Sequence, residues 1–369
     1  MAPEKDETRI PYFTGDSHFQ SDYPLLDVII SFMTRICITP FVQGTGGMAS
    51  FRLKFEQGLK ARNIDVTHDL NDNADAVLVI AGTRFLLDLN RARRRGIRVV
   101  QRLDGINWVQ RVKWSGIKYS VRAEYGNIML AAIRNLFADR VIYQSQFIRR
   151  WWEDWYGIAK VPASVIINGV DLGTYTPEGE NERPTDKYRM LLLEGSLARG
   201  LNSGLFHAVS VAEKMSAKYP MEVLVAGTVD EATQKKFAQG KNGLSVNFLG
   251  TVPRAEIPKL ARSSHMMYCA EVNPPCPNSV IEALACGLPV IGFDSGSLKE
   301  LVTDTAGVIV PYGANPWKLE TPDIAALASS AGDVLEKQDQ FRAAARRRAE
   351  SDLGLDGMVE SYLKVLLED

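Results

Sequence analysis

Short apolar runs recur along the chain, separated by segments long enough for a helix, and this alternation limits the fold more than any other feature. In the first half the runs are residues 36–39, 76–80, 97–100, 141–143 and 165–167. In the second half they are residues 190–193, 223–226, 246–249, 266–269, 290–293 and 308–310. Strands that alternate with helices form parallel sheets covered by helices on both faces. The pattern predicts an α/β protein with two doubly wound, Rossmann-like domains that face each other across a cleft.

The domain boundaries follow from length and local composition. A chain of 369 residues is long enough for two domains. Residues 1–33 are polar and without period, which predicts an irregular N-terminal arm, and residues 34–170 form the first domain. Residues 171–189 are rich in Gly, Pro and Glu and are the expected linker. The second domain is then 190–350, followed by a C-terminal helix at 351–369 that packs back on the first domain.

Composition and motifs exclude several classes of protein. The net charge of −1 and the apolar content of 46% are typical of a globular protein rather than a disordered one. The N-terminus is too charged for a signal peptide, and the four cysteines form no C-x-x-C pair, so we expect buried free thiols in a soluble cytoplasmic protein. The chain contains no P-loop, no H-E-x-x-H and no Asp-x-Asp motif. We therefore expect no metal, no cofactor and no nucleic-acid partner.

A glycine-rich turn follows the first apolar run. Residues 44–49 read Gly-Thr-Gly-Gly-Met-Ala, which fits G-x-G-x-x-A, and Met48, Phe51, Phe55 and Leu59 then predict one face of a helix. Glycines let a ligand approach the backbone, and a helix N-terminus attracts anions. With Asp65 or Asp69 as the ribose-binding acid, the turn fits an NAD-type oxidoreductase. A tight turn without any ligand fits equally well.

A second helix start lies in the second half of the chain. Asn278 and Ser279 stand where a helix N-cap is expected, and Gly287 and Pro289 suit its end. The free N–H groups of such a helix can bind phosphate. Glu282 lies three residues after Ser279, so it either completes a capping box or reaches vicinal ribose hydroxyls.

The segment Asn-Ser-Val-Ile-Glu-Ala-Leu-Ala-Cys-Gly-Leu-Pro-Val at 278–290 resembles the donor-binding signature of nucleotide-sugar glycosyltransferases with the GT-B fold, especially glycosyltransferase family 4. Further segments resemble that family in the right order: Gly46-Gly47 and residues 102–105, 166–171, 194–200, 223–227 and 307–310. The resemblance extends over roughly residues 35–369.

The resemblance implies a role for each matching residue. Glu282 resembles the second Glu of the E-x7-E motif, which holds the donor ribose. The expected donor-binding residues are Gly46, Gly47, Gly195, Ser196, Asn278, Ser279 and Glu282, and the expected catalytic residues are Asp104, which would contact the transferred sugar, and Arg199.

Two positions depart from the family pattern. The first Glu of the motif would fall at Pro274, and the nearby Glu271 is out of register. In the second departure, Ser196 follows Gly195 where the family has a phosphate-binding cation, which leaves Arg199.

The resemblance implies a retaining, metal-independent glycosyltransferase of the hexosyltransferase class. It would transfer a sugar from a UDP- or GDP-sugar to an acceptor hydroxyl, in polysaccharide or glycolipid biosynthesis. Besides the oxidoreductase, a non-catalytic module that binds sugar nucleotides is the other alternative.

Charge and tryptophan content suggest where the acceptor comes from. Residues 1–170 carry 23 basic and 17 acidic side chains, whereas the rest carries 20 and 27. Five tryptophans follow the basic stretch: Trp108, Trp114, Trp151, Trp152 and Trp155. Tryptophan suits a lipid–water interface. We therefore expect an anionic acceptor, either a saccharide or a lipid-linked saccharide, and a peripheral contact with the cytoplasmic membrane face. The alternative is a soluble basic face with the tryptophans in the core.

Overall fold

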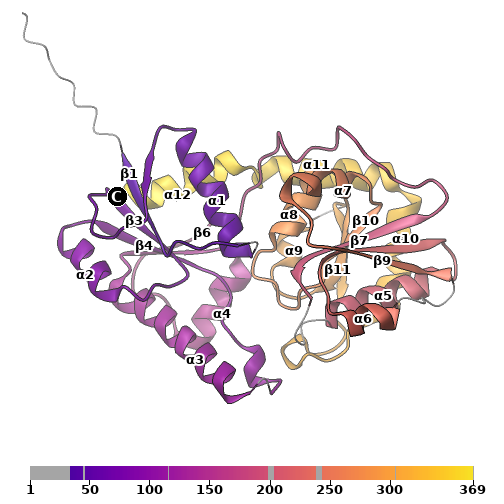
Figure 1. Ribbon diagram of the computed structural model, residues 1–369, viewed down its shortest axis with the longest axis horizontal. Helices are drawn as coiled ribbons and strands as arrows, with labels where there is room; N and C mark the ends of the chain where they lie inside the picture. Colours follow the sequence, from indigo (N-terminus) through magenta and orange to yellow (C-terminus); the bar gives the residue numbers. More distant parts are fainter. Residues whose placement is uncertain are drawn as a thin grey trace, which may run out of the picture. The chain divides into compact units, whose positions relative to one another are not determined.

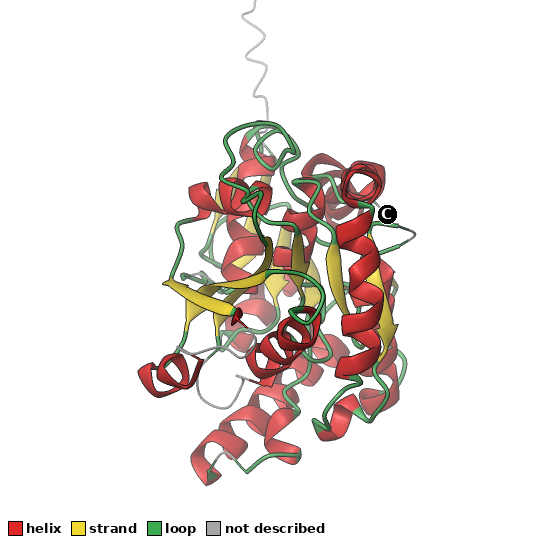
Figure 2. Cartoon of the chain, turned by 90° about the vertical axis from the view of Figure 1, so that its right-hand side faces the viewer, coloured by secondary structure: helices red, strands yellow, loops and turns green. Residues whose placement is uncertain are grey.

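The computed structural model describes residues 34–44, 46–114, 116–197, 203–237, 243–303 and 305–368. These residues form two six-stranded parallel sheets, each with helices on both faces (Figures 1 and 2). The predicted arm at residues 1–33 lies outside the described residues. The predicted α/β class with two doubly wound sheets is confirmed.

The first sheet has the strand order β2-β1-β3-β4-β5-β6. Its strands are β1 Arg35–Thr39, β2 Asp65–Thr67, β3 Ala76–Ile80, β4 Arg98–Leu103, β5 Arg140–Tyr143 and β6 Ala163–Val165. All pairs are parallel, with Ile36 opposite Val66 on one side and Ala76 on the other. Every residue of β3 is buried, as expected for a central parallel strand covered on both faces. The sequence pattern missed β2, because this three-residue strand is half-buried and carries polar residues.

The helices of the first half connect these strands. They are α1 Gly47–Lys60, α2 Leu86–Arg94, α3 Ile117–Ala132 and α4 Gln146–Tyr156, with a 3₁₀ turn η1 Val109–Arg111 and a π-helical turn η2 Ile133–Phe137. In α1, Phe51, Phe55 and Leu59 are buried as predicted, but Met48 is exposed. Ser145 caps α4, because its hydroxyl accepts a hydrogen bond from the Ile148 N–H at 3.1 Å.

The second sheet has the order β12-β11-β10-β7-β8-β9. Its strands are β7 Tyr188–Ser196, β8 Met221–Thr228, β9 Ser245–Gly250, β10 Met266–Tyr268, β11 Val290–Asp294 and β12 Gly307–Pro311. The helices of this half are α5 Ser203–Met215, α6 Glu231–Phe237, α7 Ile257–Arg262, α8 Asn278–Ala285, α9 Leu298–Leu301, α10 Ile324–Glu336 and α11 Gln338–Asp352, with 3₁₀ turns η4 Arg254–Glu256 and η5 Pro316–Lys318. Residues 171–187, between the sheets, contain no helix or strand.

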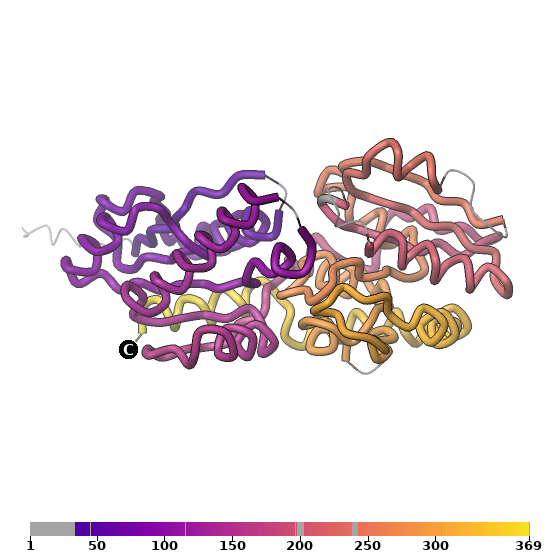
Figure 3. The backbone as a smooth tube through the Cα atoms, turned by 90° about the horizontal axis from the view of Figure 1, so that it is seen from below, coloured from indigo at the N-terminus to yellow at the C-terminus, as the bar shows by residue number. Residues whose placement is uncertain are grey.

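The last helix, α12 Leu355–Leu367, belongs to the first sheet although it follows the second sheet in the chain. It packs against α1, β3 and β4, and Figure 3 shows the yellow C-terminal segment beside the indigo and purple first half. Val359 and Tyr362 are fully buried in one apolar cluster with Ile36 and Phe51. The first hydrophobic core is therefore built from both ends of the described chain.

The four cysteines are free and buried, as the sequence predicts. Among the helices that the structure describes, none combines the length and the apolar character needed to cross a membrane.

Candidate active site

The strand orders define where a ligand is expected in each sheet. In the second sheet β7 and β10 are neighbours, and the chain leaves them in opposite directions. In the first sheet β1 lies between β2 and β3. Ligands of open α/β sheets bind outside the carboxyl ends of the strands at such switch points. A cavity of about 570 Å³ lies there, lined by residues that follow β1, β4 and β10 and by residues at the carboxyl end of β7.

Seven of the nine predicted site residues line this cavity. They are Gly46, Gly47, Asp104, Gly195, Asn278, Ser279 and Glu282. Of the other two, Ser196 ends β7, and Arg199 lies outside the described residues.

Two helices begin at the cavity. Gly46 is the N-cap of α1, and a Cβ atom added to Gly47 would lie 4.0 Å from Nδ2 of Asn278, at the start of α8. The first backbone hydrogen bond of α8 runs from the Val280 N–H to the Pro277 carbonyl. The N-terminal N–H groups of a helix have no intrahelical acceptor and carry partial positive charge. The two helix starts therefore form an anion-binding wall.

The predicted N-cap of α8 is wrong, and of the two alternatives for Glu282 the capping box is not formed. Its N-cap is Pro277, which has no side chain that can accept a hydrogen bond, and α8 shows no side-chain cap. The carboxylate of Glu282 instead accepts a hydrogen bond from Nζ of Lys54 on α1, at 2.8 Å. Both side chains are nearly buried, with 12% of Lys54 and 8% of Glu282 exposed. The predicted helix end is correct, because Gly287 follows the C-cap with a φ of +64°.

Two arginines bring positive charge to the cavity. Arg102, on β4, is buried, with its guanidinium 3.9 Å from the ring centre of Phe51 and Nη2 donating to Oδ1 of Asn168 at 3.0 Å. Within the described part of the chain, Nε and Nη1 of Arg102 have no hydrogen-bond acceptor. Arg254 lines the cavity from η4. Guanidinium groups that line a cavity favour an anionic ligand.

Three carboxyl groups lie together on the cavity wall: Asp104, Glu194 and Glu271. Desolvation by the surrounding protein raises the pKa of each of them. The negative charges of Glu194 and Asp104 raise the pKa of Glu271 further, whereas the positive charge of Arg102 opposes the shift at Asp104. Among the described residues, no protein group donates a hydrogen bond to the Glu271 carboxylate, so its oxygens are available to a ligand.

A bulge places Glu194 at this wall. The register between β7 and β8 shifts between Leu193 and Ser196, and bulges re-aim side chains. The bulge needs Gly227 on β8, because a Cβ atom there would overlap the carbonyl oxygen of Glu194.

In the ranges that the structure describes, no group of three or more His, Cys, Asp or Glu side chains is arranged to hold a metal ion.

Comparisons with known proteins agree with this geometry. Residues 33–174 match the family described as Glycosyltransferase Family 4, and residues 181–351 match the family described as Glycosyl transferases group 1. The chain is a GT-B glycosyltransferase.

Solved structures share the fold of this glycosyltransferase. Sucrose-phosphate synthase of Thermosynechococcus elongatus superimposes with a TM-score of 0.67 at 15% identity, covering 90% of this chain and 98% of that one. Anabaena HepE in complex with UDP-glucose gives a TM-score of 0.61 at 16% identity, covering 90% and 99%.

One curated relative is similar in sequence, the 2-deoxystreptamine N-acetyl-D-glucosaminyltransferase of Streptomyces fradiae. It is 26% identical over 140 residues, which are 36% of this chain and 31% of that protein. The matched region thus spans about a third of the relative.

The structure does not support the oxidoreductase alternative. Asp65 is the first residue of β2, where it pairs with Arg35 at 2.6 Å, and Asp69 is bonded to Asn71. Neither acid lines the cavity of the glycosyltransferase, so the glycine-rich turn has no ribose-binding partner of the dinucleotide type.

Sequence reasoning missed Arg102, Arg254, Glu194 and Lys54, and set Glu271 aside because of its register. A usable signal existed for Glu194 and Glu271, because both follow apolar runs at the carboxyl ends of adjacent parallel strands. No local signal pairs Lys54 with Glu282, since 228 residues separate them.

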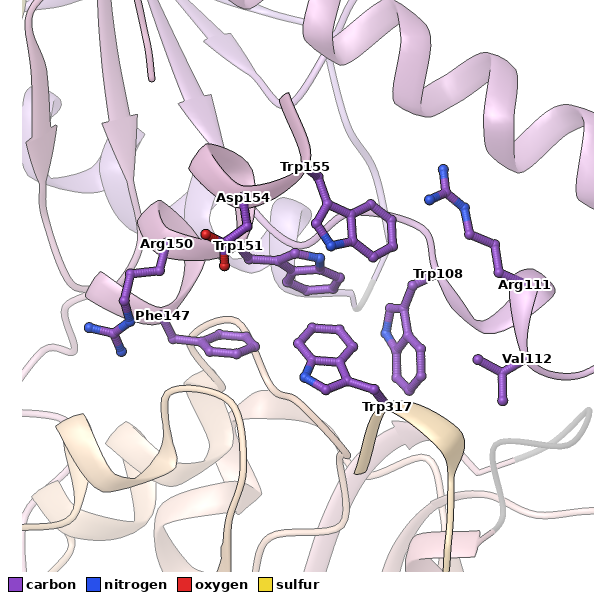
Figure 4. Close-up of a pocket in the computed structure, with 9 residues that line it drawn as sticks. All are labelled: Trp108, Arg111, Val112, Phe147, Arg150, Trp151, Asp154, Trp155 and Trp317. Carbon is purple, nitrogen blue, oxygen red and sulfur yellow. The ribbon is translucent and has the colours of Figure 1, made fainter. Parts of the chain in front are cut away.

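A second cavity, of about 480 Å³, is mainly aromatic. Phe147, Trp151 and Trp155 come from α4, Trp108 from the loop after β4, and Trp317 from η5 of the second half (Figure 4). Figure 4 shows the rings of Trp108, Trp151 and Trp317 turned toward one another, and the ring centres of Trp151 and Trp317 are 4.8 Å apart. The two cavities adjoin the loop after β4, because a Cβ atom added to Gly105 would contact both Trp151 of the aromatic cavity and Pro275 of the first cavity.

The predicted interfacial role of the tryptophans is wrong for three of the five. Trp108, Trp151 and Trp152 are buried, and the indole N–H of Trp152 donates to the Asp104 carbonyl at 2.8 Å. Trp155 is partly exposed, and Trp114 is 75% exposed.

Proposed function

We propose that this glycosyltransferase transfers a sugar from a UDP- or GDP-sugar to an acceptor hydroxyl with retention of the anomeric configuration. The observation that carries the proposal is the cavity between the starts of α1 and α8, which joins an anion-binding wall to a cluster of carboxyl groups. A nucleotide-sugar has the matching halves, a diphosphate and a hydroxyl-rich ring.

The leaving group is the nucleoside diphosphate. As the bond between the anomeric carbon and the β-phosphate oxygen breaks, negative charge grows on the diphosphate. The N-termini of α1 and α8, together with Arg102 and Arg254, offer positive charge there. The acceptor oxygen bonds to the same face of the anomeric carbon, and its proton passes to an oxygen of the leaving phosphate, as the family resemblance implies. Such a step requires no protein nucleophile.

The sugar ring would lie against Asp104, Glu194 and Glu271. Carboxylates that lie on a cavity wall and have few protein donors can accept hydrogen bonds from ligand hydroxyl groups. Glu271 thus supplies a carboxylate near the place where Pro274 interrupts the family motif. Glu282 would hold the ribose, and Gly195 and Ser196 would adjoin the diphosphate.

We propose that the acceptor binds at the aromatic cavity. Trp108 and Trp317 offer flat apolar faces that suit the C–H face of a sugar ring, and the buried indole N–H of Trp151 has no acceptor within the described residues. Arg111 and Arg150 also line this cavity and favour an anionic saccharide, free or lipid-linked. We therefore propose a role in polysaccharide or glycolipid biosynthesis at the cytoplasmic membrane face.

The donor is tested by thermal shift with UDP, GDP, UDP-glucose, GDP-mannose and UDP-N-acetylglucosamine. The last is included because of the name of the S. fradiae relative. The true donor should raise the melting temperature, since a ligand that binds only the folded state stabilises it. Slow hydrolysis of that donor without acceptor then distinguishes an enzyme from a binding module.

The carboxyl cluster is tested with Glu271→Gln and the matched control Glu231→Gln, on the exposed helix α6. Glu271→Gln should raise the donor KM and leave the affinity for free nucleotide unchanged, because the nucleotide has no transferred sugar. Equal loss of nucleotide and donor affinity would contradict the placement of the sugar.

A further inference from the structure

Helix α3 exposes an apolar face. Ile117, Val121, Tyr125 and Ile128 follow one another at spacings of four, four and three residues, which place them on one side of a helix. These four side chains are 60–69% exposed. The opposite side of α3 carries its buried residues, among them Asn127. The helix is thus packed on one side and bare on the other.

Exposed apolar groups are concentrated around α3. More than half of the large apolar side chains exposed on the described surface fall between residues 85 and 136. Trp114 precedes the helix. Phe85 is the N-cap residue of α2 and Leu87 lies in α2, which packs against the η2 continuation of α3; Figure 1 shows α2 beside α3. A concentration of exposed apolar side chains of this kind is typical of an interaction site.

Basic side chains flank the apolar face. Lys118 and Arg122 are exposed and lie one residue further round the helix from Ile117 and Val121. The one acidic residue of α3, Glu124, is bonded to Arg111 at 2.7 Å. The helix therefore presents apolar side chains with a basic edge, the pattern of a helix that lies in the plane of a membrane interface.

We propose that α3 docks this glycosyltransferase on an anionic lipid bilayer, with Ile117, Val121, Tyr125 and Ile128 buried at the boundary between headgroups and acyl chains. Lys118 and Arg122 face the anionic headgroups, and Trp114 lies at the interface. A symmetric dimer through the same face would bring the basic edges of two copies together, so charge favours the bilayer over a second copy.

The docking surface leads to the acceptor side of the protein. Arg111 and Val112 line the aromatic cavity, and α3 begins five residues after Val112. A lipid-linked saccharide would reach that cavity from the bilayer without leaving the interface. This use of the surface rests on the proposed function, but the binding to lipid does not.

The test is co-sedimentation with vesicles of phosphatidylcholine alone or with an equal part of phosphatidylglycerol, at low and high salt. The wild-type protein should pellet with anionic vesicles at low salt and be released by high salt. Each of Ile117→Ser, Val121→Ser and Ile128→Ser should weaken partitioning by about tenfold, because each removes one buried apolar side chain. Ile158→Ser is the matched control, because Ile158 is 77% exposed and lies outside this face.

The contribution of the basic edge of α3 is tested separately with the double variant Lys118→Glu and Arg122→Glu. The matched control is the double variant Lys214→Glu and Lys235→Glu, in the second half of the chain. Only the first pair should abolish binding to anionic vesicles. All variants change exposed side chains, so unchanged melting temperatures confirm folding.

Three results would overturn the proposal. They are the absence of pelleting with anionic vesicles at low salt, equal loss in the Ile158 control, and a concentration-dependent dimer that the α3 variants dissociate. Nucleotide affinity measured on the same samples distinguishes failure of the docking surface from failure of the proposed function.

Discussion

The ion pair between Lys54 and Glu282 joins the first half of the protein to the helix that starts at the donor cavity. Removing one partner of a nearly buried pair leaves an uncompensated charge, which typically costs about 3–5 kcal/mol. Glu282 also borders the cavity, where water can reach it, so Lys54→Met should lower the free energy of unfolding by about 3 kcal/mol. Glu282→Gln should cost about 2 kcal/mol, because the amide oxygen can still accept from the ammonium group.

The double variant separates this ion pair from other effects of the two substitutions. Once one partner is gone, removing the other leaves no unpaired charge, so the two costs should not add. Urea denaturation of the four proteins should give a coupling free energy above about 1 kcal/mol. Lys60→Met is the control, because Lys60 is exposed at the end of the same helix, and it should change stability by less than about 0.5 kcal/mol. Costs that add to within about 0.5 kcal/mol would refute the reasoning.

Calorimetric titration with free UDP and GDP then tests the proposed contact between Glu282 and the ribose of the nucleotide. Glu282→Gln should weaken nucleotide binding by about 10- to 100-fold, the value of a hydrogen bond to a charged group. Unchanged affinity with lowered stability would leave Glu282 only its structural contact with Lys54.

Three further predictions concern chemistry, pH and packing. Glycosyltransferase activity should survive a chelator, and loss of activity in EDTA that manganese restores would contradict this prediction. The variant Arg199→Ala should have strongly reduced activity. Burial lowers the pKa of His265 to about 4. Between pH 6.5 and 4 the imidazole is therefore protonated in the unfolded chain but still neutral in the folded protein. The free energy of unfolding should fall by up to about 3 kcal/mol over this pH range. His265→Gln should remove that slope in urea titrations, and an unchanged slope would assign it elsewhere. Gly58→Ala should destabilise by about 1–3 kcal/mol, because its Cβ would overlap Val359, whereas Gly357→Ala meets open space and should be neutral or stabilising by up to about 1 kcal/mol. Equal melting temperatures for these two variants would argue against the packing of α12.

Much of the fold could be predicted because its signals are local. Continuous apolar runs gave all strands but β2, whose three residues are too few and too polar to form a pattern. The start of α8 was recognisable because Asn278 and Ser279 stand between a proline and an apolar helix face. Its capping could not be predicted, because the partner of Glu282 lies on α1.

The site was less predictable where geometry depends on a loop or on tertiary packing. The family motif places its first Glu eight residues before Glu282, at Pro274, and this assumes a loop of fixed length. The turn through Asn273, with a φ of +54°, brings Glu271 to the cavity instead. The spacing of Ile117, Val121 and Ile128 normally predicts a buried helix face. Only the structure shows that no described element covers it.

The position of α12 has a consequence for synthesis of the protein. The strands and α1 of the first sheet emerge from the ribosome early, yet the helix that covers Ile36 and Phe51 is made only after the whole second sheet. Until then, the nascent first half exposes an apolar surface that its own residues do not cover, while the second sheet can already be completed. The half that is translated first is therefore the half whose core is completed last, and its uncovered apolar surface is open to aggregation for the longest time.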